Sequence, residues 1–129
     1  MSRKPEAVFR RSVHKYLAEG VYYQSIDGTA TAGTPDSYYE KLRFSAWVEW
    51  KYTRSKVPRE FRRLTDLQKD WMSRAWENQQ LVGVIIGCPN GGYVCKDMGD
   101  YELNKFEGPF KRAYVAEWIF MQLLNRRAK

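Results

Sequence analysis

The stretch Trp47-Val48-Glu49-Trp50-Lys51, preceded by Gly33-Thr34-Pro35-Asp36, decides the fold of this chain. In an extended strand, alternate side chains point to the same side of the sheet. Glu49 and Lys51 therefore share one face, and the apolar residues between and before them share the other. The second face predicts burial, and the first sets a carboxylate beside an ammonium group.

A second carboxylate, Asp36, lies in a proline-led turn thirteen positions before Glu49. Taken alone, Asp36 is typical of an ordinary turn, and the Glu49–Lys51 pair is typical of a surface ion pair. Together they differ from both, because charged groups in a tryptophan-rich strand are costly to desolvate without partners or a metal. Two carboxylates bind a hard divalent cation through oxygen, and a neighbouring lysine can polarise a water. The combined pattern predicts a metal site.

The order of these motifs resembles the PD-(D/E)xK nuclease superfamily, and within it the small VRR-NUC-like and Holliday-junction-resolvase-like group. That group carries an acidic residue on an N-terminal helix, then Gly-x-Pro-Asp, then Glu-x-Lys on the next long strand, then a helical Gln and a hairpin. The corresponding positions here are Glu6, 33–36, 49–51, Gln68 and the hairpin 81–96. The resemblance covers nearly the whole chain.

Two positions depart from the family pattern. Trp50 stands where a modest aliphatic residue is usual, so it needs a large pocket on the core side. Ser37 follows Asp36 in place of the customary apolar residue. Neither side chain belongs to the expected ligand set, and both departures leave open a modified site geometry.

The resemblance implies an Mg²⁺- or Mn²⁺-dependent deoxyribonuclease. Asp36 and Glu49 would bind the metal with the Trp50 carbonyl as a backbone ligand, and Lys51 would orient the attacking water. Glu6 would be a further metal contact, although a carboxylate in a first helical turn also interacts well with the helix dipole. Gln68 would lie near the active site as a catalytic residue.

Gln68 has a second explanation from the residues alone. The sequence Thr65-Asp66-Leu67-Gln68 is a capping-box signature, in which the Gln side chain reaches back to the cap residue. One residue can serve both purposes.

Hydrophobic periodicity and turn residues predict an α/β protein with a restriction-endonuclease-like core, a mixed β-sheet flanked by helices, in the order α-β-β-β-α-β-β-α. One domain is expected over residues 1–129. The expected helices are 5–20, 65–80 and 110–124, the last opened by Pro109; the expected strands are 21–26, 37–40, 44–52, 81–87 and 93–96, and 97–107 is expected to be a polar connection.

The formal net charge of +7 and pI near 9.5 favour a polyanionic partner, and DNA is the expected one. A basic connector directly follows Lys51. It is expected to contact phosphate, with a solvated loop as the alternative. Its cationic residues are Arg54, Lys56, Arg59, Arg62 and Arg63. Four tyrosines are candidates for base stacking or for simple half-burial in strands: Tyr22, Tyr23, Tyr38 and Tyr39.

The two cysteines flank a predicted hairpin turn at Asn90-Gly91. That turn would set Cys88 opposite Tyr93 and Cys95 opposite Ile86, further apart than a disulfide prefers, so both thiols are expected to be reduced. With the single histidine, His14, they are too few for a structural zinc site. We expect His14 at the surface without a partner.

No run of residues has the length and apolarity of a membrane span or the apolar core of a signal peptide. The expected location is the cytoplasm of a bacterial or phage-infected cell. The sequence also lacks a Walker loop, a dinucleotide fingerprint and a Ser or Cys triad motif.

Cleavage of branched or junction DNA, as in recombination and repair, is the leading functional prediction. A nickase or general DNA endonuclease of phage or mobile-element type is an alternative, and so is a non-catalytic nucleic-acid-binding module with the same fold. Symmetric junctions need two cuts, which favours a homodimer. The apolar side chains of the last helix fit either a dimer interface or the protein's own core.

Overall fold

A computed structural model describes residues 4–26, 33–54, 64–96, 98–103 and 105–125. Its helices and strands, in chain order, are α1 (Pro5–His14), β1 (Tyr22–Ser25), β2 (Ser37–Lys41), β3 (Phe44–Tyr52), α2 (Asp66–Glu77), β4 (Leu81–Cys88), β5 (Gly91–Cys95), α3 (Met98–Glu102), β6 (Glu107–Phe110) and α4 (Arg112–Asn125).

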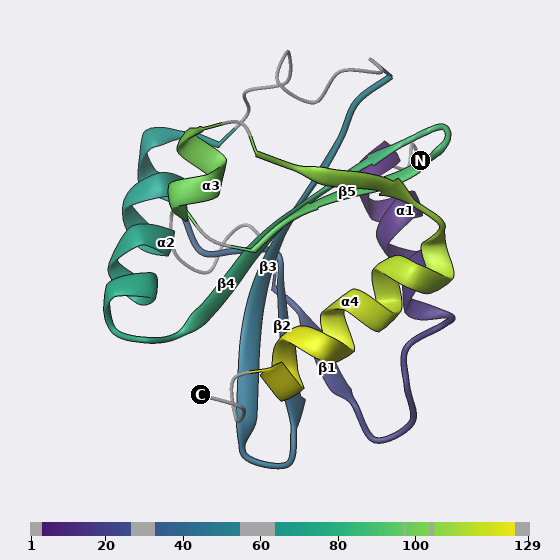
Figure 1. The fold of residues 1–129 in the computed structure, drawn as a ribbon, viewed down its shortest axis with the longest axis horizontal. Coiled ribbons are helices and arrows are strands. Elements are labelled where there is room, and N and C mark those ends of the chain that lie inside the picture. The colour runs from purple at the N-terminus through teal and green to yellow at the C-terminus, as the bar shows by residue number, and fades with distance from the viewer. Residues whose placement is uncertain (1–3, 27–32, 55–63, 97, 104, 126–129) are drawn as a thin grey trace.

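The six strands form one mixed sheet in the order of the sequence, β1-β2-β3-β4-β5-β6. Neighbouring strands are antiparallel except β3 and β4, which run parallel because α2 connects them. Figure 1 shows α2 and α3 on one side of the sheet and α1 and α4 on the other. The predicted α/β class with a mixed sheet flanked by helices is confirmed.

Two hydrophobic clusters hold the helices on the sheet, one on each face. The α1 and α4 side packs Phe9, Val115 and Ile119 against the apolar face of β3, where Trp50 is only 1% exposed. The α2 and α3 side packs Met72 and its neighbours against β4 and β5. Because both faces are covered, β3 is the central buried strand that its tryptophans predict.

A pair of glycines makes room for the largest inward side chain of α1. Gly87 and Gly92 lie directly opposite each other on β4 and β5. A Cβ atom at Gly87 would come within 2.5 Å of the Phe9 ring, and one at Gly92 within 2.9 Å. The two glycines therefore let Phe9 lie flat on the sheet, where it also contacts the Trp50 ring at 6.1 Å between centroids.

The C-terminal third differs from the prediction. Residues 97–107 are not only a polar connection, since they include the short helix α3, and Pro109 lies in β6 rather than at the start of a helix. β6 pairs with β5 through Gly92 and Phe110 at the edge of the sheet. An edge strand tolerates proline because one side of its backbone makes no ladder hydrogen bonds, and the last helix begins after it, at Arg112.

The β4–β5 register also differs from the prediction. Cys88 pairs with Gly91 and Cys95 with Val84, so Pro89 and Asn90 form the turn in place of Asn90 and Gly91. Both cysteines are buried and free, as expected. The first helix is shorter than predicted and ends at His14. None of the helices among the described residues has the length and apolarity needed to cross a membrane.

Candidate active site

Asp36 is held against β3 by a hydrogen bond that continues the sheet. β2 begins at Ser37, opposite Val48, so Trp50 lies beyond the last β2 backbone partner. The Trp50 N–H donates instead to Asp36 Oδ2 at 3.1 Å. The side chain of Asp36 thus takes the place of a strand carbonyl, which fixes its carboxylate beside the strand that carries Glu49 and Lys51.

Gly33 brings the Asp36 turn against the start of α2. Its φ is +89°, a conformation that side-chain-bearing residues rarely adopt. A Cβ atom there would lie 2.5 Å from the Leu67 carbonyl oxygen. The glycine of the Gly-Thr-Pro-Asp motif is therefore needed for close approach to the helix that carries Gln68.

Glu49, Lys51 and Gln68 form one hydrogen-bonded group. Lys51 Nζ lies 3.3 Å from Glu49 Oε2, which also accepts a hydrogen bond from Gln68 Nε2 at 3.0 Å. Lys51 Nζ donates to Gln68 Oε1 at 3.4 Å. The Glu49 side chain is 3% exposed and that of Lys51 is 19% exposed, so the carboxylate lies beneath the ammonium group.

Gln68 makes both contacts that its sequence position allows. The capping box predicted from Thr65 is present: the Thr65 N–H donates to Gln68 Oε1 at 2.9 Å, and the Gln68 N–H donates to Thr65 Oγ1 at 3.1 Å. The same amide therefore caps α2 and orients Glu49. The Gln68 side chain therefore connects the N-terminus of α2 to the Glu49 carboxylate through hydrogen bonds.

The electrostatics of the two carboxylates reflect burial and mutual repulsion. Burial, followed by the charge of Asp36, raises the pKa of Glu49 to about 7, against the opposing influence of Lys51. Burial also raises the pKa of Asp36, while the Trp50 N–H and the Lys51 charge act in the opposite direction. A pair of carboxylates that disfavours its own ionisation is the arrangement that a divalent cation relieves.

One oxygen of Glu49 lacks a partner. The backbone N–H of Asp36 lies near enough to favour the ionised carboxylate, yet Oε1 is buried with no hydrogen-bond partner among the described residues. A buried polar atom left unpaired is rare in folded proteins. Oxygen ligands from one or two carboxylates are what Mg²⁺ uses, with waters completing its shell, so the donor set fits such an ion.

Two residues of α1 also lie near Asp36. The charge of Glu6 raises the pKa of Asp36 and that of Arg10 lowers it, so both side chains act on the site from its α1 side. Glu6 was predicted from the sequence and Arg10 was not. The available signal for Arg10 was its helical spacing, one turn after Glu6 on the same side of α1.

His14 is not the unpartnered surface residue that the sequence predicted. A hydrogen bond of 2.7 Å joins its Nε2 to the hydroxyl of Tyr39, and its ring packs edge-on to Trp50 at 5.8 Å. Burial, assisted by the charge of Arg10, lowers the pKa of His14 to about 4. Tyr39 is fully buried, which excludes it from base stacking.

The basic connector is placed only at its start. Arg54 is exposed two residues after the end of β3, whereas Lys56, Arg59, Arg62 and Arg63 lie outside the described residues. Within the described part of the chain, no group of three or more His, Cys, Asp or Glu side chains is arranged to hold a metal, so any cation would depend on the two carboxylates, backbone oxygen and water.

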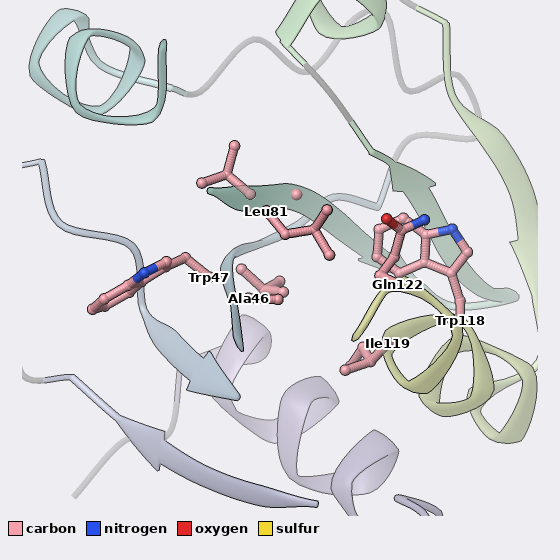
Figure 2. A pocket seen from close by; sticks show the side chains of 9 residues that line it. Ala46, Trp47, Leu81, Trp118, Ile119 and Gln122 are labelled. Atoms are coloured by element: carbon pink, nitrogen blue, oxygen red, sulfur yellow. The ribbon is translucent and has the colours of Figure 1, made fainter. Parts of the chain in front are cut away.

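The apolar recess in Figure 2 is separate from this site. It lies where the first residues of β3 and β4 meet Trp118, Ile119 and Gln122 of α4. Its volume is about 10 Å³, room for roughly one water. The recess is too small and too apolar to hold a nucleotide.

Comparison with known proteins finds a similar fold in a solved Holliday junction resolvase. The solved structure of the Holliday junction resolvase Hjc from Archaeoglobus fulgidus, an archaeal hyperthermophile, is similar with a TM-score of 0.52 and 15% sequence identity. The match covers 85% of this chain and 98% of the resolvase chain. No family model and no curated protein matches the sequence, so the likeness is one of fold.

Proposed function

We propose that this protein is a divalent-metal-dependent DNA endonuclease that acts on branched DNA, with the four-way junction as its preferred substrate. The observation that carries the proposal is the buried Glu49 carboxylate, whose Oε1 has no hydrogen-bond partner among the described residues and which lies beside Asp36 and Lys51. Leaving a buried carboxylate oxygen without a partner costs free energy, and a bound cation would supply that partner.

Asp36 and Glu49 are the residues that would hold the cation. The N–H and C=O of one strand residue point to the same neighbouring strand; the Trp50 N–H points to Asp36, so the Trp50 carbonyl is directed to that side too and is available as a third ligand. Glu6 is close enough to influence Asp36 and would contribute through water. The chemistry supplied at such a site is polarisation of the scissile phosphate and activation of a bound water.

The remaining residues of the site would position the reacting groups and stabilise charge on the phosphate. The Lys51 ammonium would orient the attacking water and offset the negative charge that develops on the phosphate. Hydrolysis forms a bond between the water oxygen and phosphorus and breaks the bond from phosphorus to the leaving sugar oxygen. The attacking water gives up a proton to solvent, and the leaving oxygen takes up a proton from solvent. Gln68 holds Glu49 in place through its amide, which makes it a positioning residue.

Three observations support branched DNA as the substrate. The net charge of +7 suits a polyanion, and the fold is similar to that of a protein described as a Holliday junction resolvase. The last helix exposes Tyr114 and Met121, 49% and 52% of each, two turns apart on one side, as an interface with a second copy would require. Two copies related by a two-fold axis would make the paired cuts that a symmetric junction needs.

The test is cleavage of a labelled four-way junction, a nicked duplex and a plain duplex with Mg²⁺, Mn²⁺ or EDTA. The wild-type protein should cut the junction fastest and only with metal, and Glu49→Ala should abolish cutting. Glu102→Ala removes an exposed glutamate from the end of α3 and is the matched control that should retain activity. Metal-independent cutting, or a Glu49→Ala protein as active as wild type, would contradict the proposal; junction binding without cutting would favour the non-catalytic module.

A further inference from the structure

A row of aromatic side chains continues from the candidate site along the α2 side of the sheet. Strand register sets Tyr38 of β2 opposite Trp47 of β3, and Gln24 of β1 opposite Tyr38. Directly opposed residues project from the same face, and alternate residues of β3 do as well. Trp47 and Tyr38 therefore share the face that carries Glu49 and Lys51.

The rings of this row contact one another in sequence. The centroids of Tyr38 and Trp47 are 4.7 Å apart, and those of Trp47 and Trp71 of α2 are 5.1 Å apart. Figure 2 shows Trp47 pointing away from Trp118 and Ile119, which belong to the other side of the sheet. Tyr22 extends the row on β1 as a diagonal neighbour of Tyr38.

The row is next to the carboxylates. Trp47 and Glu49 are alternate residues of one strand, about 7 Å apart along its axis. Two residues of α2 follow the same order. Gln68 contacts Glu49, and Trp71, which lies nearly one turn later, contacts Trp47. A strand of DNA that leaves the site along β3 would pass directly over these rings.

Core packing accounts for only part of the row. Trp47 and Trp71 pack partly against the cluster beneath α2, but Tyr22 and Tyr38 belong to neither buried cluster. Tyr22 is 56% exposed, and all four residues of β1 are exposed. Tyr38 is fixed in orientation because its hydroxyl donates to Glu40 Oε2 at 2.6 Å. Rigid, half-exposed rings beyond the helix are available to a ligand.

Cationic groups border the row as the phosphates of a strand would require. The Arg74 guanidinium lies 5.7 Å from the centroid of the Trp71 ring. Arg43 is exposed in the turn between β2 and β3, and Lys51 lies at the opposite end of β3. Glu40, an acidic residue beside the row on β2, accepts a hydrogen bond from the Tyr38 hydroxyl. Aromatic faces with flanking positive charge are the usual means of binding unpaired nucleic acid without sequence preference.

We propose that Tyr22, Tyr38, Trp47 and Trp71 form a stacking platform for the bases of an unpaired DNA strand that leaves the candidate active site. Bases inside a duplex are already stacked, so such a platform takes only single-stranded DNA. The inference rests on the proposed function and narrows its substrate class to branched DNA that has a single-stranded arm beside the scissile phosphate.

The test is binding in EDTA, where cleavage is not required. Fluorescence anisotropy with labelled oligo(dT) and with a paired duplex of equal length would compare wild type, Tyr38→Ala and Tyr38→Phe. Tyr38→Ala should weaken oligo(dT) binding about 5- to 150-fold, the range that corresponds to loss of one stacked base, and should leave duplex binding unchanged. Tyr38→Phe should restore oligo(dT) binding, and oligo(dT) should quench the tryptophan fluorescence of the wild type.

Two further variants keep the result interpretable. Tyr16→Ala removes a tyrosine that is 57% exposed, just after α1, and should leave both affinities unchanged. Tyr22→Ala, at an exposed position, should weaken oligo(dT) binding even if Tyr38→Ala fails to fold. Equal affinities for oligo(dT) across all variants, or an equal loss for duplex, would overturn the platform. A protein that shows this binding pattern but never cuts would keep the platform and lose the nuclease proposal; one that cuts without the pattern would do the reverse.

Discussion

The two faces of β3 carry opposite kinds of chemistry on one backbone. The face toward α1 and α4 presents Trp50 and its apolar neighbours to a closed core, whereas the face toward α2 presents Trp47, Glu49 and Lys51. The first is stabilised by burial of apolar area. The second buries a carboxylate whose pKa is raised to about 7 by desolvation and by Asp36. The difference shows how one strand can carry a destabilising buried carboxylate. Burial of the apolar face stabilises the strand, and this offsets the cost of desolvating Glu49 on the polar face.

The largest effect is expected from the core face. Trp50→Ala should lower the free energy of unfolding by about 3–5 kcal/mol, because it leaves a cavity against Phe9 and His14. Trp47→Ala, on the half-buried opposite face, should lower it by only about 1–2 kcal/mol. Urea unfolding would measure the loss of stability in both variants, provided that the dependence of the unfolding free energy on urea concentration is the same as in the wild type. Equal losses would mean that the two faces of β3 contribute alike to the core.

The next effect concerns the polar face alone. Lys51→Ala should lower the rate of junction cleavage about 10²- to 10³-fold, the usual result of removing one group that stabilises transition-state charge, and should leave junction affinity in EDTA nearly unchanged. Lys69→Ala is the control, since its ammonium lies 4.0 Å from the exposed Asp66 carboxylate. Single-turnover kinetics would separate the two variants. A Lys51→Ala protein that cuts normally but binds weakly would assign the lysine to affinity.

The two faces should also respond to pH with opposite signs. Glu49 has a folded pKa of about 7, above its ordinary value of 4.5, so the folded state of the metal-free protein retains this proton longer and loses stability as pH rises from about 4.5 to 7. His14 has a folded pKa of about 4, below 6.5, so stability increases as pH rises from about 4 to 6.5. Each contribution is at most about 3 kcal/mol.

The pH dependences of stability that arise from Glu49 and from His14 have opposite signs and partly cancel, so single substitutions should reveal each one. Glu49→Gln should remove the fall and leave stability rising with pH, and His14→Gln should remove the rise and leave it falling. Urea unfolding in EDTA at several pH values would measure this, with Glu40→Gln at an exposed position as the control. A Glu49→Gln protein that still loses stability between pH 4.5 and 7 would show that another group, such as Asp36, causes the fall in stability with rising pH.

The smallest effect separates the two contacts of Gln68. Thr65→Ala breaks only the helix cap and should lower stability by about 1 kcal/mol without slowing cleavage. Gln68→Ala breaks the cap and also frees Glu49, so it should lower stability by a similar amount and additionally slow cleavage about 10-fold. Identical cleavage rates in the two variants would reduce Gln68 to a capping residue.

The sequence predicted best the features that depend on neighbouring residues. The bounds of β3, the Thr65 capping box and the alternation of Trp50 with Glu49 and Lys51 all appear in the structure as expected. These follow from side-chain periodicity and from contacts within one turn of helix. Asp36 was also expected beside Glu49 and Lys51, and its carboxylate accepts a hydrogen bond from the Trp50 N–H of β3.

The features that the sequence missed arise between segments that are distant in the chain. Pro109 indicated a helix start, but pairing with β5 made it an edge-strand residue. The contact of His14 with Tyr39 joins residues 25 positions apart, and Arg10 has no local motif that relates it to Asp36.

By itself, then, the sequence determined the class of fold, the central strand and the pair of carboxylates, because strand alternation and turn chemistry are local. Only the tertiary structure decided that Gly33 presses the Asp36 turn onto α2, that Gln68 reaches Glu49, and that Trp47 and Tyr38 align beside them. Those relations depend on the register of strands and the docking of a helix. Register and docking are set by the packing of the whole core, which no short stretch of sequence specifies.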